Sequence, residues 1–170
     1  MMMQMLIAGG LPALVDDARE ADTDNPRGYF ELDAVKRTAL DASWLRGARG
    51  KVVKVISFLL SSLPTDLEYR IVFVRRNLDH VVRSQAAMLA RRGRDVRQSE
   101  LQARATLAEH LVDVETWFEQ ARHVRALGVS YERVLAAPAA EVERIATFLG
   151  VPLDRDAMAR VVEPTLCRQR

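Results

Sequence analysis

A short apolar run that passes directly into a helical pattern is the feature that most constrains how this chain can fold. The run YRIVFV (69–74) is rich in β-branched and aromatic residues, which favours a buried strand. Apolar residues then follow at helical spacing: Val81, Val82, Ala86 and Leu89. Two further runs, KVVKVIS (51–57) and HVRALGVSY (123–131), are also predicted strands. Strands that alternate with helices over 170 residues predict an α/β fold with a parallel sheet.

Helical signals account for most of the remaining chain. The opening stretch MMMQMLIAGG (1–10) predicts an amphipathic helix that ends at its two glycines. The segment YFELDAVKRTAL (29–40) has helical spacing, with Phe30, Val35 and Leu40 as inward positions. SFLLSSLP (57–64) predicts a helical turn.

Two helices in the second half of the chain have clear boundary signals. One begins near Ser99, which forms a predicted capping box with Gln102. Its expected apolar face is Leu101, Ala105, Leu111, Val114 and Phe118. The other lies within residues 137–152, with Pro138 in its first turn and Gly150 just past its end.

The composition limits the classes of partner. Lysine and arginine (25) nearly balance aspartate and glutamate (23), and most of the basic residues are arginine, which binds phosphate and sulfate well. A solvated helix surface is the alternative explanation for these arginines. The arginine-rich run RRGRDVR (91–97) lacks interleaved aromatic residues, so we expect no nucleic-acid partner. The single cysteine, Cys167, fits a reducing cytoplasm, and no apolar run is long enough to span a membrane.

The junction FVRRNLDHVVRSQ is the strongest candidate for a binding site. Parallel sheets bind ligands at the carboxyl ends of their strands, where the helices begin. Arg76 stands at such an end, and Ser84 follows two helical turns later. An arginine fork and a hydroxyl at one junction could hold a phosphate between them. Alternatively, Arg76 pairs with an acidic neighbour and Ser84 faces solvent.

Four segments in order resemble a known family. A strand that ends in Arg-Asn, with a serine eight residues after the arginine, resembles the 3′-phosphate-binding segment of bacterial sulfotransferases that use 3′-phosphoadenosine-5′-phosphosulfate (PAPS). Leu78 replaces the usual proline, and Asp79 stands one place early. The stretches NPRGYFE (25–31), 51–64 and 129–152 resemble other parts of these enzymes, as does the ending EPTLCRQR.

The resemblance implies a role for each matching residue. Arg76 and Ser84 would bind the nucleotide, and Arg168 would close over it. Many members take a catalytic base from a histidine two residues after the lysine at Lys54, but Ile56 stands there in this chain. Glu31, in the Asn-Pro-x-Gly-aromatic setting, is the expected base instead, while Lys54 would contact the sulfuryl group or the substrate. The glutamate and the lysine could also be ordinary surface residues.

The resemblance also implies what surrounds these residues. The donor would be PAPS and the acceptor a hydroxyl or amine, with no metal required, and a homo-oligomer is compatible with the family. The expected fold is a P-loop NTPase-like three-layer α/β/α domain. The loop P-x-S-G-T-S/T that binds the 5′-phosphosulfate in this family does not occur in these 170 residues. We therefore expect one incomplete domain, residues 1–170, that lacks the first strand and this loop and is inactive or impaired as it stands.

Two other functions stay open from the sequence. The chain could be a non-catalytic relative that binds a nucleotide or another protein. It could also be an α/β protein of the nucleotide kinase type. The kinase interpretation is the weaker one, because the chain has no G-x-x-x-x-G-K-[ST] loop and no acidic metal-binding strand end.

Overall fold

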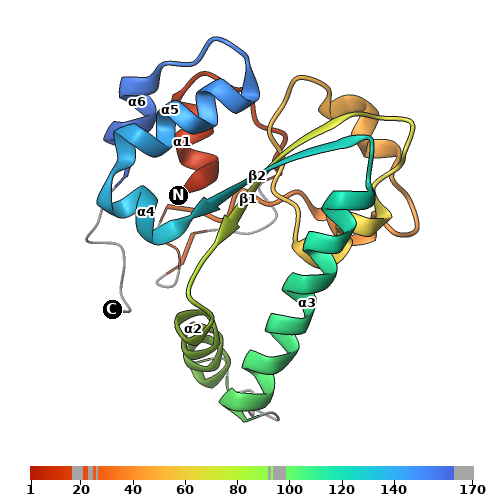
Figure 1. The fold of residues 1–170 in the computed structure, drawn as a ribbon, viewed down its shortest axis with the longest axis vertical. Helices are drawn as coiled ribbons and strands as arrows, with labels where there is room; N and C mark the ends of the chain where they lie inside the picture. Colours follow the sequence, from red (N-terminus) through yellow and green to blue (C-terminus); the bar gives the residue numbers. More distant parts are fainter. Residues whose placement is uncertain (17–20, 23–24, 26, 92, 94–98, 163–170) are drawn as a thin grey trace.

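Two parallel strands lie at the centre of the molecule (Figure 1). The computed structural model describes residues 1–16, 21–22, 25, 27–91, 93 and 99–162. Strand β1 (Tyr69–Arg75) pairs with β2 (Val124–Ser130) from Tyr69↔Val124 to Arg75↔Ser130. Both strands lie where the sequence predicts them, and their parallel pairing confirms the expected mixed α/β character.

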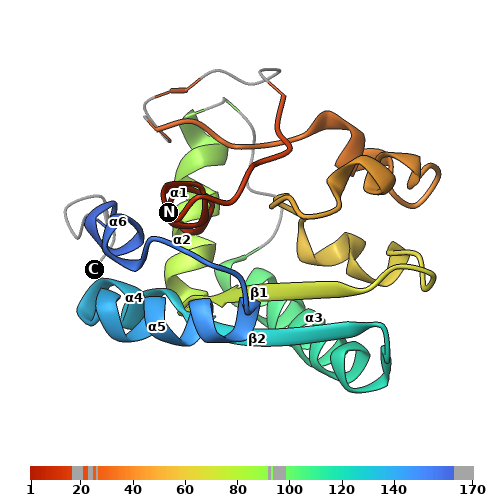
Figure 2. The ribbon, with the colours of Figure 1, turned by 90° about the horizontal axis from the view of Figure 1, so that it is seen from above.

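Helices and 3₁₀ turns surround the strands. The chain order of the described helices is α1 (Met2–Ala8), η1 (Asp33–Arg37), η2 (Ser43–Ala48), η3 (Ser57–Ser62), α2 (Leu78–Arg91), α3 (Glu100–Gln120), α4 (Tyr131–Ala136), α5 (Pro138–Leu149) and α6 (Arg155–Arg160). Figures 1 and 2 place α1, α4, α5 and α6 together at one end of the molecule and the 3₁₀ segments at the other. Helices α2 and α3 connect the two strands.

Side chains of β1 alternate between two hydrophobic cores. Tyr69, Ile71 and Phe73 pack against a cluster made by η2, η3 and α3. Val72 packs on the other side, against a cluster from α1, β2, α4, α5 and α6. Because successive side chains of a strand point to opposite faces, the strand contributes to both cores. The two strands therefore separate two groups of helices.

The structure confirms the helix boundaries that capping residues, proline and glycine predict. The Ser99 hydroxyl accepts a hydrogen bond from the Gln102 N–H, and the Gln102 side chain accepts one from the Ser99 N–H, which confirms the capping box. Pro138 occupies the first turn of α5, and Gly150 follows its end with a left-handed φ of 62°. The first helix ends at Gly9, as predicted.

The predicted strand at residues 51–57 is wrong. Only one isolated parallel bridge forms there, between Ala13 and Val52. The Val52 N–H donates to the Pro12 carbonyl, and the Leu14 N–H donates to the Val52 carbonyl. Extending the ladder toward residue 57 would need the Asp16 N–H, but this donor bonds to the Glu31 carbonyl at 2.9 Å, so the β-branched run stays largely unpaired. Residues 57–62 then form η3, which confirms the predicted helical turn.

The predicted helix at residues 29–40 is mostly wrong. Only the short 3₁₀ helix η1 forms, around the buried Val35. Phe30 has a left-handed φ of 52°, which prevents a helix from running through the start of the segment. Leu40 is exposed instead of inward-facing.

Helix α3 buries only part of its predicted apolar face. Val114 is buried and Phe118 half-buried in the core beside β1. Leu101 and Ala105 are exposed, contrary to prediction. Ion pairs hold the helix in place as well: Glu115 pairs with Arg75 of β1, and Arg104 Nε lies 2.8 Å from Asp79 Oδ1 of α2.

Candidate functional site

The carboxyl ends of β1 and β2 meet where two helices begin. Arg75 and Ser130 form the last paired position of the two strands. Helix α2 starts three residues after Arg75, and α4 starts directly after Ser130. The parallel pairing therefore brings the predicted binding junction next to a second strand-to-helix junction.

Asn77 fixes the turn that follows Arg76. Its Oδ1 accepts hydrogen bonds from the backbone N–H groups of Asp79 (2.9 Å) and His80 (3.3 Å). These are first-turn donors that have no partner within the helix, so Asn77 caps α2. Leu78 occupies the first helical position, the place at which a proline is well tolerated.

Glu132 joins the two junctions. Its Oε1 accepts a hydrogen bond from the Asn77 N–H at 3.0 Å, and its Oε2 accepts one from the Ser130 hydroxyl at 2.9 Å. Partial burial raises the pKa of this carboxyl group, but the hydrogen bonds and the nearby Arg76 charge outweigh that effect, so the pKa lies below its usual value. Glu132 was not among the residues predicted from the sequence. Its local signal is a serine cap followed two residues later by an acid at a helix start.

Arg76 has a donor that the surrounding protein does not satisfy. The guanidinium carbon lies 4.8 Å from the centre of the Tyr131 ring, so the side chain stacks against α4. Its Nε is buried, and no hydrogen-bond acceptor contacts it within the described residues. A buried unsatisfied donor is costly. An anion that accepted this N–H would remove that cost.

Ser84 lies in α2, whereas Arg76 precedes that helix. It is half-buried in the second turn of α2. No hydrogen bond between the two side chains occurs in the described part of the chain. Arg76 directly follows β1, and Ser84 lies in the helix that begins after it.

Glu31 and Lys54 come together, although 23 residues separate them. The Lys54 Nζ lies 3.0 Å from Glu31 Oε1 and also donates to the Tyr29 carbonyl at 3.2 Å. The Asp16 N–H donates to the Glu31 carbonyl at 2.9 Å, which holds the Glu31 segment beside the segment that carries the Ala13–Val52 bridge. A carboxylate and an ammonium group thus form a half-buried ion pair.

The beginning of α1 lies near this pair. Burial lowers the pKa of the Met1 amino group, and the positive charges of Lys54 and Arg27 lower it further. Arg27 in turn donates to the Val161 carbonyl at 3.2 Å. Among the described residues, no hydrogen bond or ion pair connects the Glu31–Lys54 pair to Arg76 or Ser84.

The remaining candidates lie elsewhere or outside the described residues. Arg168 and Cys167 belong to the stretch 163–170, which is not described. His110 and His123 make local packing contacts: His110 stacks on Phe58, and His123 packs edge-on against Tyr69. In the described ranges, no group of three or more potential metal ligands occurs, and no helix is long and apolar enough to cross a membrane.

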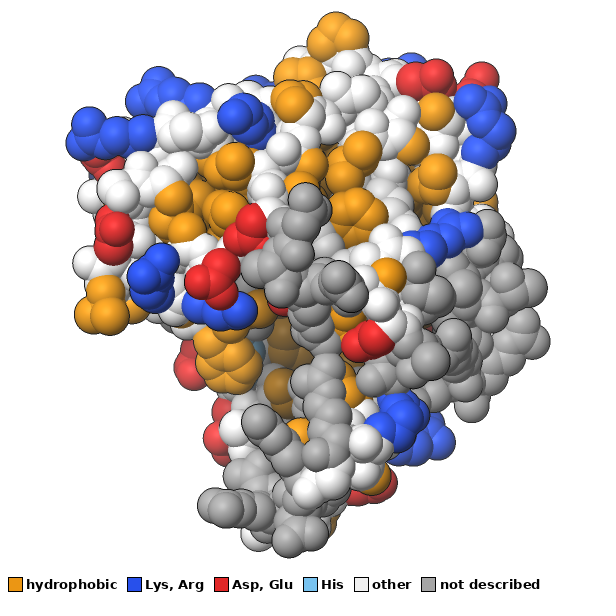
Figure 3. All heavy atoms as spheres, turned by 180° about the vertical axis from the view of Figure 1, so that it is seen from behind, with side chains coloured by type: hydrophobic (Ala, Val, Ile, Leu, Met, Phe, Trp, Pro, Cys, Tyr) orange, Lys and Arg blue, Asp and Glu red, His pale blue; other side chains and the backbone are white. Residues whose placement is uncertain are grey.

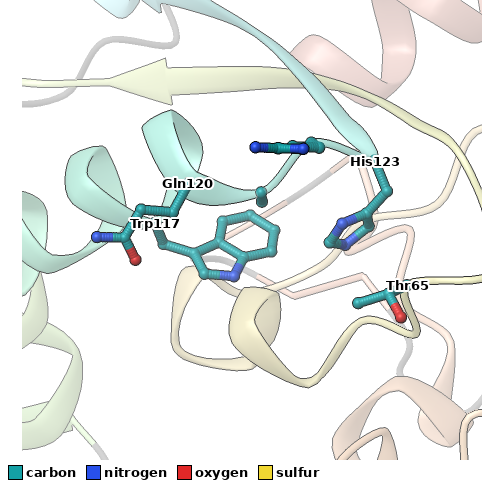
Figure 4. Close-up of a pocket in the computed structure, with 6 residues that line it drawn as sticks. Thr65, Trp117, Gln120 and His123 are labelled. Carbon is teal, nitrogen blue, oxygen red and sulfur yellow. The ribbon is translucent and has the colours of Figure 1, made fainter.

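A shallow hollow of about 510 Å³ opens at the opposite end of the strands (Figure 4). Thr65 and His123 line it just before the two strands begin, and Trp117 and Gln120 come from the end of α3. The His123 Nε2 is buried without a hydrogen-bond partner in the described structure. None of the predicted site residues lines this hollow, so it does not identify the site.

Comparison with known proteins agrees with the motifs. A model of the sulfotransferase family matches residues 15–155, a range that contains Glu31, Lys54, Arg76 and Ser84. No curated protein and no solved structure matches the chain. The family match covers most of the sequence and confirms the predicted resemblance to the sulfotransferase family. The chain therefore belongs to the sulfotransferase family.

Proposed function

We propose that this protein binds PAPS and takes part in sulfuryl transfer to an acceptor hydroxyl or amine. Arg76 and Ser84 hold the 3′-phosphate of the nucleotide, and Arg168 closes over it. The observation that carries this proposal is the buried, unsatisfied Nε of Arg76 at the carboxyl end of β1. A phosphate oxygen would accept this N–H, and the remaining guanidinium donors suit a second oxygen.

Glu31 and Lys54 serve the chemical step. The acceptor oxygen forms a bond to sulfur while the bond from sulfur to the nucleotide phosphate breaks, and that phosphate keeps the electron pair. Glu31 takes the acceptor proton, and Lys54 stabilises negative charge on the sulfuryl oxygens. The 3.0 Å ion pair between Lys54 Nζ and Glu31 Oε1 supports a shared role. When the substrate enters, the pair can separate, so that Glu31 contacts the acceptor and Lys54 contacts the sulfuryl group. We place both residues in a P-loop-like sulfotransferase domain.

Turnover also needs an element that binds the 5′-phosphosulfate. The motif P-x-S-G-T-S/T is not among these 170 residues. We therefore propose that the chain as given retains nucleotide binding and has little or no transferase activity of its own. If the chain binds the nucleotide but shows no turnover, both as given and with upstream coding sequence, the result would instead favour a non-catalytic relative.

Nucleotide binding is tested with adenosine 3′,5′-bisphosphate and isothermal titration calorimetry. We expect Arg76→Ala to weaken binding about 10- to 100-fold, because charge-assisted hydrogen bonds are lost. Ser84→Ala should weaken it about 3- to 10-fold, the effect of one neutral hydrogen bond. Arg83→Ala is the matched control, since Arg83 precedes Ser84 on α2 and bonds only to the Asp79 carbonyl among described residues. Equal losses for Arg76→Ala and Arg83→Ala would reduce the effect to net charge and refute the site.

The role of Glu31 is tested by turnover. The protein is expressed with any coding sequence in frame upstream of Met1, and sulfuryl transfer from PAPS is measured. Glu31→Gln should lower kcat at least about 100-fold, the typical contribution of a general base, and leave bisphosphate binding unchanged. Asp33→Asn is the control, because this nearby exposed carboxylate pairs with Lys36. Wild-type turnover of Glu31→Gln would remove Glu31 from the mechanism.

A further inference from the structure

A carboxylate lies beside Arg76 without neutralising it. Glu132 is within electrostatic reach of the Arg76 guanidinium group. Its oxygens accept hydrogen bonds from other groups, Oε1 from the Asn77 N–H at 3.0 Å and Oε2 from the Ser130 hydroxyl at 2.9 Å. The Arg76 Nε, for its part, has no acceptor among the described residues. The acidic neighbour of Arg76 is therefore bonded elsewhere, and the guanidinium group keeps an unused donor.

The two hydrogen bonds of Glu132 continue the link between the strands past the end of their ladder. Arg75 and Ser130 are the last paired residues of β1 and β2. Beyond them, the Asn77 N–H donates to a side chain of α4 instead of to the backbone of β2. The Ser130 hydroxyl serves twice, because it donates to Glu132 and accepts from the Arg133 N–H at 3.2 Å. Glu132 thereby holds the turn that follows β1 against the start of α4.

The same contact sets where the Arg76 side chain lies. Arg76 directly precedes Asn77, whose N–H donates to Glu132. Its guanidinium carbon lies 4.8 Å from the centre of the Tyr131 ring, and Tyr131 directly precedes Glu132 in α4. One carboxylate thus connects the turn that carries Arg76 to the helix start that carries its stacking partner. Without it, α2 keeps its Asn77 cap, but the turn loses its hydrogen bond to α4.

Local contacts, rather than a general positive field, have to attract an anion to Arg76. The formal net charge of the chain is only +2. Figure 3 shows basic and acidic side chains interspersed over one face of the molecule, with hydrophobic side chains between them. The position of a single guanidinium group therefore decides how well a phosphate binds, because hydrogen bonds weaken steeply as their geometry becomes less linear.

We infer that Glu132 is the positioning residue of the proposed phosphate site: it holds Arg76 in place through Asn77, while its own carboxylate is kept from neutralising the guanidinium group. This inference rests on the proposed function, since it takes the ligand of Arg76 to be the 3′-phosphate of the nucleotide. The negative charge of Glu132 lies near that phosphate and opposes its binding. A side chain of the same length without the charge would keep the hydrogen bonds and remove the repulsion.

Two substitutions at Glu132 separate positioning from charge. Binding of adenosine 3′,5′-bisphosphate to the chain as given is measured by isothermal titration calorimetry. Glu132→Ala removes both hydrogen bonds and should weaken binding about 10-fold. Glu132→Gln can still accept from the Asn77 N–H and donate to the Ser130 hydroxyl, so it should bind as tightly as the wild type or up to about 5-fold tighter. Glu143→Ala is the matched control, because it removes a glutamate that pairs with Arg155 of α6 instead.

Nuclear magnetic resonance reports on the Arg76 side chain itself. Its Nε–H cross-peak, assigned by its loss in Arg76→Lys, should move downfield when the bisphosphate binds, because the Nε–H then gains an acceptor. We expect the full shift in Glu132→Gln and a clearly smaller one in Glu132→Ala at saturating bisphosphate. A purely structural role in α4 would lower the melting temperature without changing this cross-peak. Thermal melts followed by circular dichroism establish that each variant is folded.

The outcomes separate this inference from the proposed function. Arg76→Ala that binds the bisphosphate like the wild type, or an Arg76 cross-peak that does not move in the wild type, would refute the nucleotide site. If Arg76→Ala weakens binding but Glu132→Ala matches the wild type in affinity and shift, Glu132 is not the positioning residue. Equal losses in Glu132→Ala and Glu132→Gln would also overturn the inference. A loss confined to Glu132→Ala, with Glu132→Gln and Glu143→Ala binding at least as tightly as the wild type, supports it.

Discussion

Glu141 is the most deeply buried charge in the described chain, with 1% of its side chain exposed. Arg144 Nη1 donates to its Oε2 at 2.5 Å. Arg133 Nε lies 3.0 Å from its Oε1, an ion pair whose geometry is not that of a hydrogen bond. Arg133 belongs to α4 and Glu141 to α5. These ion pairs therefore connect α4, the helix that carries Tyr131 and Glu132, to α5.

Substitutions in this cluster should have unequal costs. Glu141→Ala leaves two arginines that are already 67% and 40% exposed, so we expect a loss of about 1.5–3 kcal/mol in the free energy of unfolding. Arg133→Ala combined with Arg144→Ala strands a buried carboxylate and should cost about 3–5 kcal/mol. Urea denaturation at pH 7 measures both values. A larger loss for Glu141→Ala than for the arginine double variant would contradict this account.

The residue scale also shows what sequence patterns can reveal about the site. Arg76, Asn77 and Ser84 can be proposed from the sequence because they belong to one local segment with fixed spacing. Glu132 is missed because its partner Asn77 lies 55 residues away, and only the pairing of β1 with β2 brings the two together. The contact between Glu31 and Lys54 likewise depends on tertiary structure, although both residues were identified individually.

At the scale of elements, Gly9 allows α1 to pack closely on α6. A Cβ added at Gly9 would lie 2.7 Å from Met158 Cγ and 2.9 Å from its Sδ. The backbone there is ordinary, with a φ of −71°, so only packing opposes a larger residue. The Asp154 N–H also donates to the Gly9 carbonyl at 3.0 Å, which fixes this approach.

Gly9→Ala should therefore destabilise the protein by about 1–2 kcal/mol, at the lower part of the range for overpacking because Met158 is flexible. Gly47→Ala in η2 is the control, since no atom lies within 4 Å of its added Cβ. That variant should stay within about 0.5 kcal/mol of the wild type or gain stability. Chemical denaturation compares the two. Equal stability of both variants would show that Met158 can move to accommodate the added methyl group at the α1–α6 contact.

Elements with several agreeing local signals were predicted well. Pro138 and Gly150 frame α5, and the Ser99–Gln102 box starts α3, because these signals act within one turn of backbone. Residues 51–57 have the composition of a strand, but a ladder also needs a partner with free donors. In the neighbouring segment the Asp16 N–H is already bonded to the Glu31 carbonyl, and no property of residues 51–57 reveals that.

At the scale of the whole molecule, alternation of strands and helices was enough to predict a parallel α/β arrangement. The division into two cores was not predictable from any one segment. It arises because Val72 and its register partner Leu127 pack on one side of the strands, while Ile71 and Phe73 pack against η2, η3 and α3 on the other. Family membership extends the interpretation beyond fold, since the roles proposed for individual residues rest on it and the geometry alone would allow several.

The long crossover between the paired strands has a consequence for how fast the protein folds. Tyr69 can meet Val124 only after the whole α2–α3 segment has closed a loop, and loop closure costs entropy before the pairing is formed. Helix formation in α2 and α3 is much faster than the assembly of distant strands. The two strand ends that carry the proposed nucleotide site therefore come together late, and we expect the site to form only in the last steps of folding.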